Sequence, residues 1–134
     1  MGVIVVGYVP QPEGRAALHR AAEEARLRDA RLVVVSSHRG GREFHRGDAL
    51  ASEAELADVR THLEAAGVQH EIRQLVRGQD PAEDLVGVAA EVNADVLVIG
   101  LRRRSPVGKL ILGSNAQRVL LEAPCPVLAV KAVE

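Results

Sequence analysis

The residues best suited to bind a charged ligand lie in one segment of the chain, from Gly100 to Ser114. The segment contains four basic side chains and no acidic one: Arg102, Arg103, Arg104 and Lys109. Its end, Gly113-Ser114, is where we expect a helix to start, and the free N–H groups and dipole of a helix start favour an anion. Glycine permits close approach of a phosphate group, and a serine hydroxyl can donate a hydrogen bond to it. The segment therefore predicts a cradle for a phosphate or another oxyanion.

Two simpler interpretations of this segment stay open. Ser114 could cap its own helix, because Gln117 lies three residues later and completes the spacing of a capping box. The arginines could form a solvated surface run, as short charge clusters usually do. Two common nucleotide motifs are absent. No GxGxxG follows a predicted strand, and Arg103 and Leu110 stand where a P-loop would have glycine and Ser or Thr.

Catalysis and metal binding have no comparable pattern in the sequence. The histidines show no metal-ligand spacing such as HExxH, and the single Cys125 can form neither an internal disulfide nor a four-cysteine zinc site. No nucleophile elbow or Ser-His-Asp arrangement is recognisable. We therefore expect no catalytic residue, no metal site and no enzyme, with slow ATP hydrolysis as a minor alternative.

Composition narrows the class of partner. The chain has 134 residues, which suits one domain over residues 1–134, and its formal net charge of -1 argues against a nucleic-acid partner. Tyr8 and Phe44 are the only aromatic residues, too few to stack on bases. No apolar run approaches the roughly 18 residues of a membrane span. The N-terminus enters the apolar run Val3–Val6 without a basic leader. We expect a cytoplasmic protein with no membrane contact.

The elements that must position the basic segment alternate along the whole chain. Short β-branched runs predict five buried strands, at residues 3–6, 32–35, 71–76, 95–99 and 127–130. Amphipathic stretches between them predict four helices, at residues 14–27, 48–66 and 80–92 and from Ser114 onward. Polar residues alternate with Ile72 in the third strand, which favours a sheet edge. The pattern predicts a single doubly wound α/β domain with a five-stranded parallel sheet.

A sheet of this kind also predicts where a ligand binds. In open α/β sheets, ligands lie beyond the carboxyl ends of the strands, where the strand order reverses. The segments to consider are therefore residues 7–13, 36–47 and 100–113, which follow the first, second and fourth strands.

Several separated segments, in the right order, resemble the universal stress protein family. Gly100 and Gly113-Ser114 are similar to its signature, G-x2-G-x9-G-[ST]. Residues 3–18, 93–100 and 123–128 resemble the family's first strand and helix, its fourth strand and its C-terminal end. The resemblance covers essentially the whole chain. It implies an adenine-nucleotide α-hydrolase-like fold with strand order 3-2-1-4-5, usually in a homodimer.

The resemblance also implies a ligand, ATP or another adenine nucleotide, with Mg²⁺ as its companion. The phosphates would rest on the fourth-strand loop and the helix after it, at Gly100, Arg102, Arg103, Gly113, Ser114 and Asn115. The base would lie at the ends of the first two strands, beside Val9, Pro10, Ser36 and Ser37. Dimers in the family commonly pair their last strands, which here contain Val127, Leu128, Ala129 and Val130.

The sequence departs from the family pattern at two positions. Arg103 replaces the second signature glycine, which blocks close backbone approach but supplies a guanidinium able to bind phosphate. Val9 replaces the acidic residue that nucleotide-binding members carry after the first strand, which removes an anchor for ribose or a metal-bound water. Two functions therefore stay open. One is a small-ligand sensor that binds an adenine nucleotide, and the other is a nucleotide-free homodimeric stress-response module whose basic loop contacts a partner protein.

Overall fold

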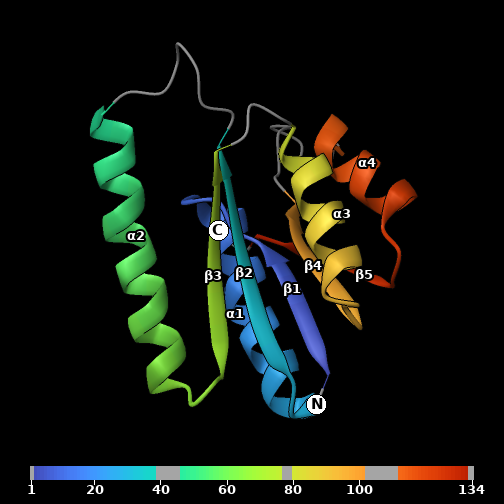
Figure 1. Ribbon diagram of the computed structural model, residues 1–134, viewed down its shortest axis with the longest axis horizontal. Helices are drawn as coiled ribbons and strands as arrows, with labels where there is room; N and C mark the ends of the chain where they lie inside the picture. Colours follow the sequence, from blue (N-terminus) through green and yellow to red (C-terminus); the bar gives the residue numbers. More distant parts are fainter. Residues whose placement is uncertain (1, 39–45, 77–79, 102–111, 133–134) are drawn as a thin grey trace.

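The computed structural model describes residues 2–38, 46–76, 80–101 and 112–132. Within these ranges, five parallel strands alternate with four helices (Figure 1). The strands are β1 (Val3–Gly7), β2 (Arg31–His38), β3 (His70–Val76), β4 (Val96–Leu101) and β5 (Val127–Lys131). The helices are α1 (Pro12–Arg28), α2 (Arg46–Ala65), α3 (Pro81–Glu91) and α4 (Ser114–Glu122). The strand order is β3-β2-β1-β4-β5, which confirms the predicted topology.

The sheet separates two apolar cores, because alternate residues of a strand point to opposite faces. Ile4 and Val6 of β1 pack with α1 and α2, whereas Val5 packs with α3 and α4. The helices accordingly form one layer on each side of the sheet (Figure 1). The central strands β1, β2 and β4 are covered on both faces, as their continuous runs of Val, Leu and Ile predict.

The β2 strand is longer than predicted. It pairs with β3 from Leu32 opposite His70 to His38 opposite Val76, so that Ser36 and Ser37 lie in the strand and not in the loop after it. The prediction stopped at Val35 because apolar patterning ends there, whereas strand pairing continues through the backbone whatever the side chains are. The two serines therefore point to opposite faces of the sheet.

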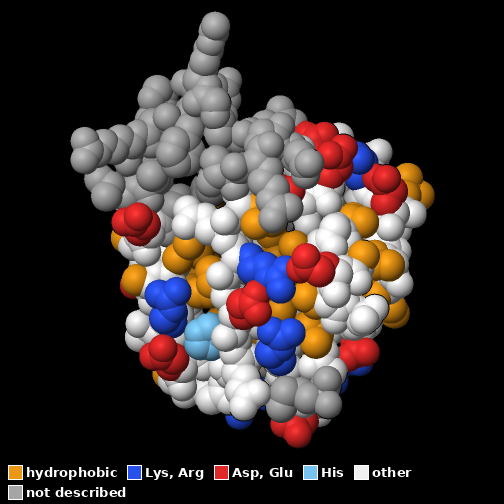
Figure 2. Space-filling view, viewed as in Figure 1, with side chains coloured by type: hydrophobic (Ala, Val, Ile, Leu, Met, Phe, Trp, Pro, Cys, Tyr) orange, Lys and Arg blue, Asp and Glu red, His pale blue; other side chains and the backbone are white. Residues whose placement is uncertain are grey.

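The β3 strand lies at an edge of the sheet, as its polar alternation predicts. Its outward face carries charged side chains that pair with one another, visible as adjoining blue and red groups in Figure 2. Glu71 accepts hydrogen bonds from Arg31 at 3.0 Å and from Arg73, which also donates to Glu91. The two arginines hold the pKa of the Glu71 carboxyl below its ordinary value. These charges keep an uncovered strand face hydrated.

None of the helices in the described ranges is long and apolar enough to cross a lipid bilayer.

Candidate ligand-binding pocket

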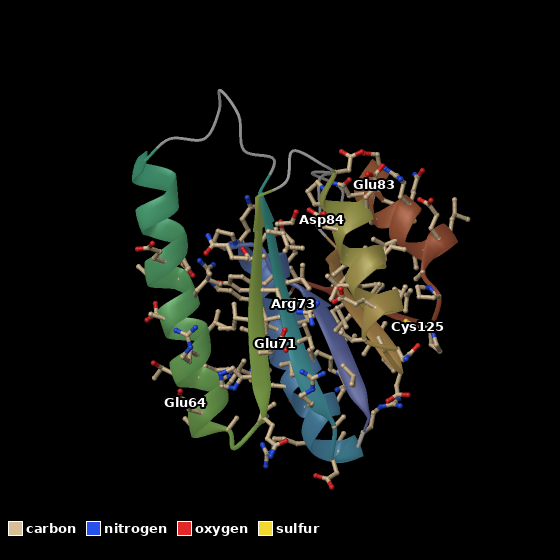
Figure 3. The ribbon with its side chains drawn as sticks, viewed as in Figure 1. Glu64, Glu71, Arg73, Glu83, Asp84 and Cys125 are labelled. Carbon is tan, nitrogen blue, oxygen red and sulfur yellow. The ribbon has the colours of Figure 1, made fainter. Side chains whose placement is uncertain are left out.

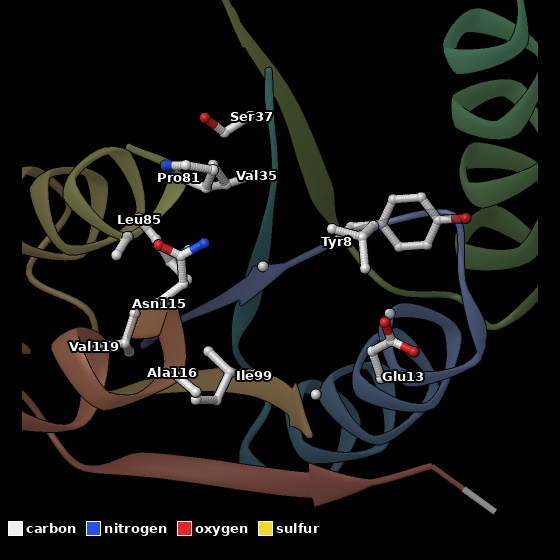
Figure 4. A pocket seen from close by; sticks show the side chains of 15 residues that line it. Tyr8, Glu13, Val35, Ser37, Pro81, Leu85, Ile99, Asn115, Ala116 and Val119 are labelled. Carbon is white, nitrogen blue, oxygen red and sulfur yellow. The ribbon is translucent and has the colours of Figure 1, made fainter. Parts of the chain in front are cut away.

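A cavity of about 200 Å³ opens at the carboxyl ends of the strands (Figure 4). Residues 7–9 line it from the end of β1, Ser37 from β2, and Ile99 and Gly100 from β4. Its wall is largely apolar and includes Val35, Leu85, Ile99, Ala116 and Val119. This is the point at which the strand order reverses, since β1 continues to β2 on one side and β4 lies on the other. The cavity therefore lies where the fold class predicts a ligand.

Three helices begin at the edge of this cavity. Its lining includes Glu13 and Gly14 from the first turn of α1, Pro81 and Ala82 from α3, and Asn115 and Ala116 from α4. The residues that cap these helices, Gln11, Asp80 and Gly113, make no side-chain hydrogen bond to the first turn. The other first-turn N–H groups therefore receive no hydrogen bond from these capping side chains, and three helix dipoles place positive charge around one cavity. Such an arrangement favours an anionic group.

Polar side chains lie at separate places around the apolar wall. The Asn115 amide reaches from α4 toward the middle of the cavity, Ser37 lies at the β2 end, and Glu13 lies on α1 (Figure 4). Asn115 can donate and accept hydrogen bonds, whereas an ionised Glu13 only accepts. The pocket could therefore hold a ligand that has an apolar ring and hydrogen-bonding groups at several positions.

Tyr8 contributes to the pocket but directs its hydroxyl away from it. The ring points toward α2 in Figure 4, and the hydroxyl donates to Glu55 Oε2 at 2.8 Å. Burial, followed by the hydrogen bond to Glu55 and the charge of that carboxylate, raises the pKa of Tyr8 to about 12. Arg15 pairs with the same carboxylate at 3.7 Å. Tyr8 thus links β1 to α2 and is not a free hydrogen-bonding group for a ligand.

The structure brings together four of the predicted site residues. Val9, Ser37, Gly100 and Asn115 all line the cavity. Pro10, Gly113 and Ser114 are not among the lining residues, and Ser36 is buried on the opposite face of the sheet. Arg102 and Arg103 lie outside the described residues, so their part in the predicted cradle stays a prediction.

The alternative interpretation of Ser114 as an N-cap with a capping box is wrong. Gly113 is the N-cap, with φ -69° and ψ 165°, and Ser114 is already the first helical residue. The Gln117 side chain donates instead to the Leu112 carbonyl oxygen at 3.3 Å. An extended Gly113 moves the helix start by one residue, and a side chain at the first helical position no longer faces the amides that an N-cap reaches. The serine is exposed rather than used as a cap.

The start of α3 lies where the sequence predicts it, and its acidic side chains bond to α4. Asp80 is the N-cap and Pro81 is the first helical residue. Arg118 of α4 donates to the Asp80 carboxylate at 3.0 Å and to Glu83 at 3.1 Å, and it also reaches Glu122. The hydrogen bonds to Glu122 and Glu83, together with the charges of these carboxylates, raise the pKa of the Arg118 guanidinium. The bonds to Asp80 and Glu83 join the first turn of α3 to α4, so the two helices form one wall of the pocket.

Gly100 has a packing role that the signature did not suggest. A Cβ atom on Gly100 would lie 2.0 Å from the carbonyl oxygen of Glu13, so glycine lets α1 approach β4. At Gly113, by contrast, no described atom lies within 4 Å of where a Cβ would be. Among these two signature glycines, Gly113 is therefore the one whose surroundings leave room for a ligand.

Sequence reasoning did not single out Glu13 or Asp84. Val9 has no carboxylate, but Glu13 in the first turn of α1 supplies one to the pocket. Asp84 is buried, with 4% exposure, and accepts a hydrogen bond from Ser37. Glu13 lies at the end of residues 7–13, one of the predicted ligand segments, and this position could have indicated it. Nothing in the sequence near Asp84 indicates that it faces Ser37, because the two residues are 47 positions apart.

Comparison with known proteins identifies the family. The model of the universal stress protein family matches residues 1–131. This chain belongs to that family. A universal stress protein of Mycolicibacterium smegmatis is 49% identical over 129 residues, which are 96% of this chain and 97% of the relative. A Thermus aquaticus universal stress protein is 37% identical, over 96% of this chain and 97% of that protein.

Solved structures of universal stress proteins share the adenine-nucleotide α-hydrolase-like fold. One from Archaeoglobus fulgidus has a TM-score of 0.81 and 39% identity and covers 98% of both chains. Another from the same organism was solved in complex with dAMP, with a TM-score of 0.76 and 34% identity over 98% of both chains. A third universal stress protein, solved with cAMP, has a TM-score of 0.77 and 28% identity over 98% of both chains.

Proposed function

We propose that this universal stress protein is a small-ligand sensor that binds an adenine nucleotide, ATP in the first place, in the cavity at the carboxyl ends of β1, β2 and β4. The observation that carries the proposal is the convergence of three helix starts without side-chain caps on one apolar cavity. Positive helix ends suit phosphate, and an apolar wall suits a purine ring. The dAMP and cAMP complexes of similar proteins support the same ligand class.

The proposal gives each part of the pocket a role. The phosphates would lie near the start of α4, where Asn115 lines the cavity and Gly113 leaves open space. The base would lie toward β2, between Val35 and Leu85. Mg²⁺ prefers oxygen ligands, and Glu13 supplies a carboxylate that could hold an ion accompanying a triphosphate. No residue is proposed to be catalytic.

A homodimer and a cytoplasmic location belong to the same proposal. The outer edge of β5, with Val127, Leu128, Ala129 and Val130, would pair with a second copy of the chain. On this edge Leu128 and Val130 are partly buried against the core, whereas Ala129 is exposed. In the described part of the chain, no strand pairs with the outer side of β5, and such an edge offers backbone groups for pairing.

Calorimetric titration with AMP, ADP, ATP and cAMP tests nucleotide binding directly. We expect saturable binding, and Asn115→Ala should weaken it by about tenfold through the loss of one or two hydrogen bonds to the ligand. Gln69→Ala is the matched control, because it removes an exposed amide just before β3, at the opposite end of the sheet.

Absence of binding by all four nucleotides would contradict the sensor function. It would favour the alternative, a nucleotide-free homodimeric interaction module whose basic loop contacts a partner protein.

A further inference from the structure

A part-buried hydrogen bond between two side chains lies at the edge of the pocket. The Ser37 hydroxyl of β2 donates to Oδ2 of Asp84 at 2.5 Å. Ser37 lines the cavity, whereas Asp84 lies in the first turn of α3 (Figure 3) and is not among the lining residues. A serine hydroxyl has one proton, so once that proton is held by Asp84 the oxygen can only accept hydrogen bonds from a ligand. The β2 end of the pocket is therefore an acceptor site.

The charge of Asp84 reinforces this preference. Its side chain is 4% exposed, and its second oxygen, Oδ1, has no hydrogen-bond partner among the described residues. A carboxylate in such a position is costly to the fold, and an unpaired buried oxygen calls for an explanation beyond packing. The positive start of α3 favours a negative side chain here, and Asp84 lies in that first turn. Negative charge next to Ser37 disfavours phosphate at this end and favours an N–H group.

We infer that Ser37 and Asp84 together select a purine that presents an amino group at position 6, as adenine does, against a 6-oxopurine. This inference rests on the proposed nucleotide function and names the residues that give it base specificity. Ser37 would contact the base, and Asp84 is a positioning residue that fixes the proton of Ser37. Val35, Pro81 and Leu85 border the same end of the cavity and suit a flat ring. A 6-oxo group would place one acceptor against another and leave both without a proton.

The first experiment uses the unaltered protein and three nucleotides that differ at position 6. AMP carries an amino donor, purine riboside 5′-monophosphate carries only hydrogen, and IMP carries an oxo acceptor. Calorimetric titration should rank them in that order, with IMP about tenfold or more weaker than AMP. Equal affinity for AMP and IMP would overturn the inference and leave the proposed function intact. Failure of AMP itself to bind would reject both.

The second experiment measures the ratio of the AMP and IMP affinities in variants. Ser37→Ala removes the acceptor, and Asp84→Asn supplies an amide that can also donate, which frees Ser37 to donate to IMP. In both variants we expect the ratio to fall to about threefold or less. Ser36→Ala is the matched control, because the neighbouring serine is buried on the opposite face and should keep the ratio of the unaltered protein.

A merely structural role would not change this ratio. Loss of stability or distortion of the pocket would weaken the binding of both nucleotides by the same factor. The inference requires the affinity for IMP to rise relative to the affinity for AMP. An unchanged ratio in Ser37→Ala would overturn it. If Asp84→Asn fails to fold, the ligand series and Ser37→Ala still decide the question.

Discussion

At the scale of single residues, Tyr8 carries a buried hydrogen bond whose strength depends on pH. Its hydroxyl donates to Glu55, and its pKa is raised to about 12 from the ordinary value near 10. A raised pKa means that the folded protein holds this proton more tightly than the unfolded chain. The contribution to stability is therefore complete below pH 10 and is lost as the pH rises through 12.

We expect Tyr8→Phe to lower the free energy of unfolding by about 1 kcal/mol at pH 7, through loss of this hydrogen bond. Between pH 10 and 12 the unaltered protein should lose on the order of 2 kcal/mol more than the variant, because a phenylalanine side chain has no proton to release. Denaturant unfolding measures both values. Since Tyr8 is the only tyrosine and the chain has no tryptophan, ultraviolet absorbance reports its ionisation alone. A titration midpoint near 10 in the folded protein would contradict this account.

At the scale of elements, glycine decides how closely α1 approaches β4 and the connection that follows β1. A Cβ at Gly100 would lie 2.0 Å from the Glu13 carbonyl oxygen, and one at Gly14 would lie 1.8 Å from that of Val9. Both obstacles are backbone atoms, which cannot move without shifting the helix. The start of α1, which carries Glu13 into the pocket, is thus held in place by residues that have no side chain.

We expect Gly100→Ala to destabilise the fold by about 3 kcal/mol, because the added methyl forces α1 away from the sheet. Gly113→Ala should cost less than about 1 kcal/mol, the usual effect of alanine at a helix N-cap, since no described atom obstructs its Cβ. Denaturant unfolding of the two variants gives the comparison. Similar losses in both would show that close packing does not explain Gly100.

At the scale of the whole molecule, β5 leaves one side of the sheet open to a second copy. Leu97 N–H donates to the Pro126 carbonyl oxygen, and Ala132 N–H donates to that of Leu101. Hydrogen bonds of a parallel strand alternate, so even-numbered residues of β5 face β4. The Ala129 amide, between them, therefore points away from the sheet.

We expect Ala129→Pro to convert the proposed dimer to a monomer while leaving the bonds to β4 intact, because proline removes only the outward amide. Light scattering after size exclusion measures the mass. Ala129→Val, which keeps the amide, should remain dimeric. A dimeric Ala129→Pro variant would move the interface elsewhere, and a monomeric unaltered protein would contradict the dimer itself.

The layered α/β fold and the family were predictable because they depend on patterns along the chain, and the resemblance to the family implied the strand order. Buried β-branched runs alternate with helical stretches, and the signature pair Gly113-Ser114 stands at its expected distance from Gly100. The site was predictable in part. Val9, Ser37, Gly100 and Asn115 line the cavity, since they lie at strand ends and a helix start that the fold must bring together. The exact start of α4 was not predictable, because an extended Gly113 is its N-cap and Ser114 is already helical.

The sequence by itself determined the layered α/β architecture and the end of the sheet at which a ligand would bind, since hydrophobic periodicity and parallel pairing fix both. Only the tertiary structure decided which side chains meet there. The contact between Ser37 and Asp84 joins residues 47 positions apart. A side chain at position 100 would clash with the backbone of α1, the first helix of the chain. Local sequence cannot encode such contacts, because they arise when separate elements pack against each other.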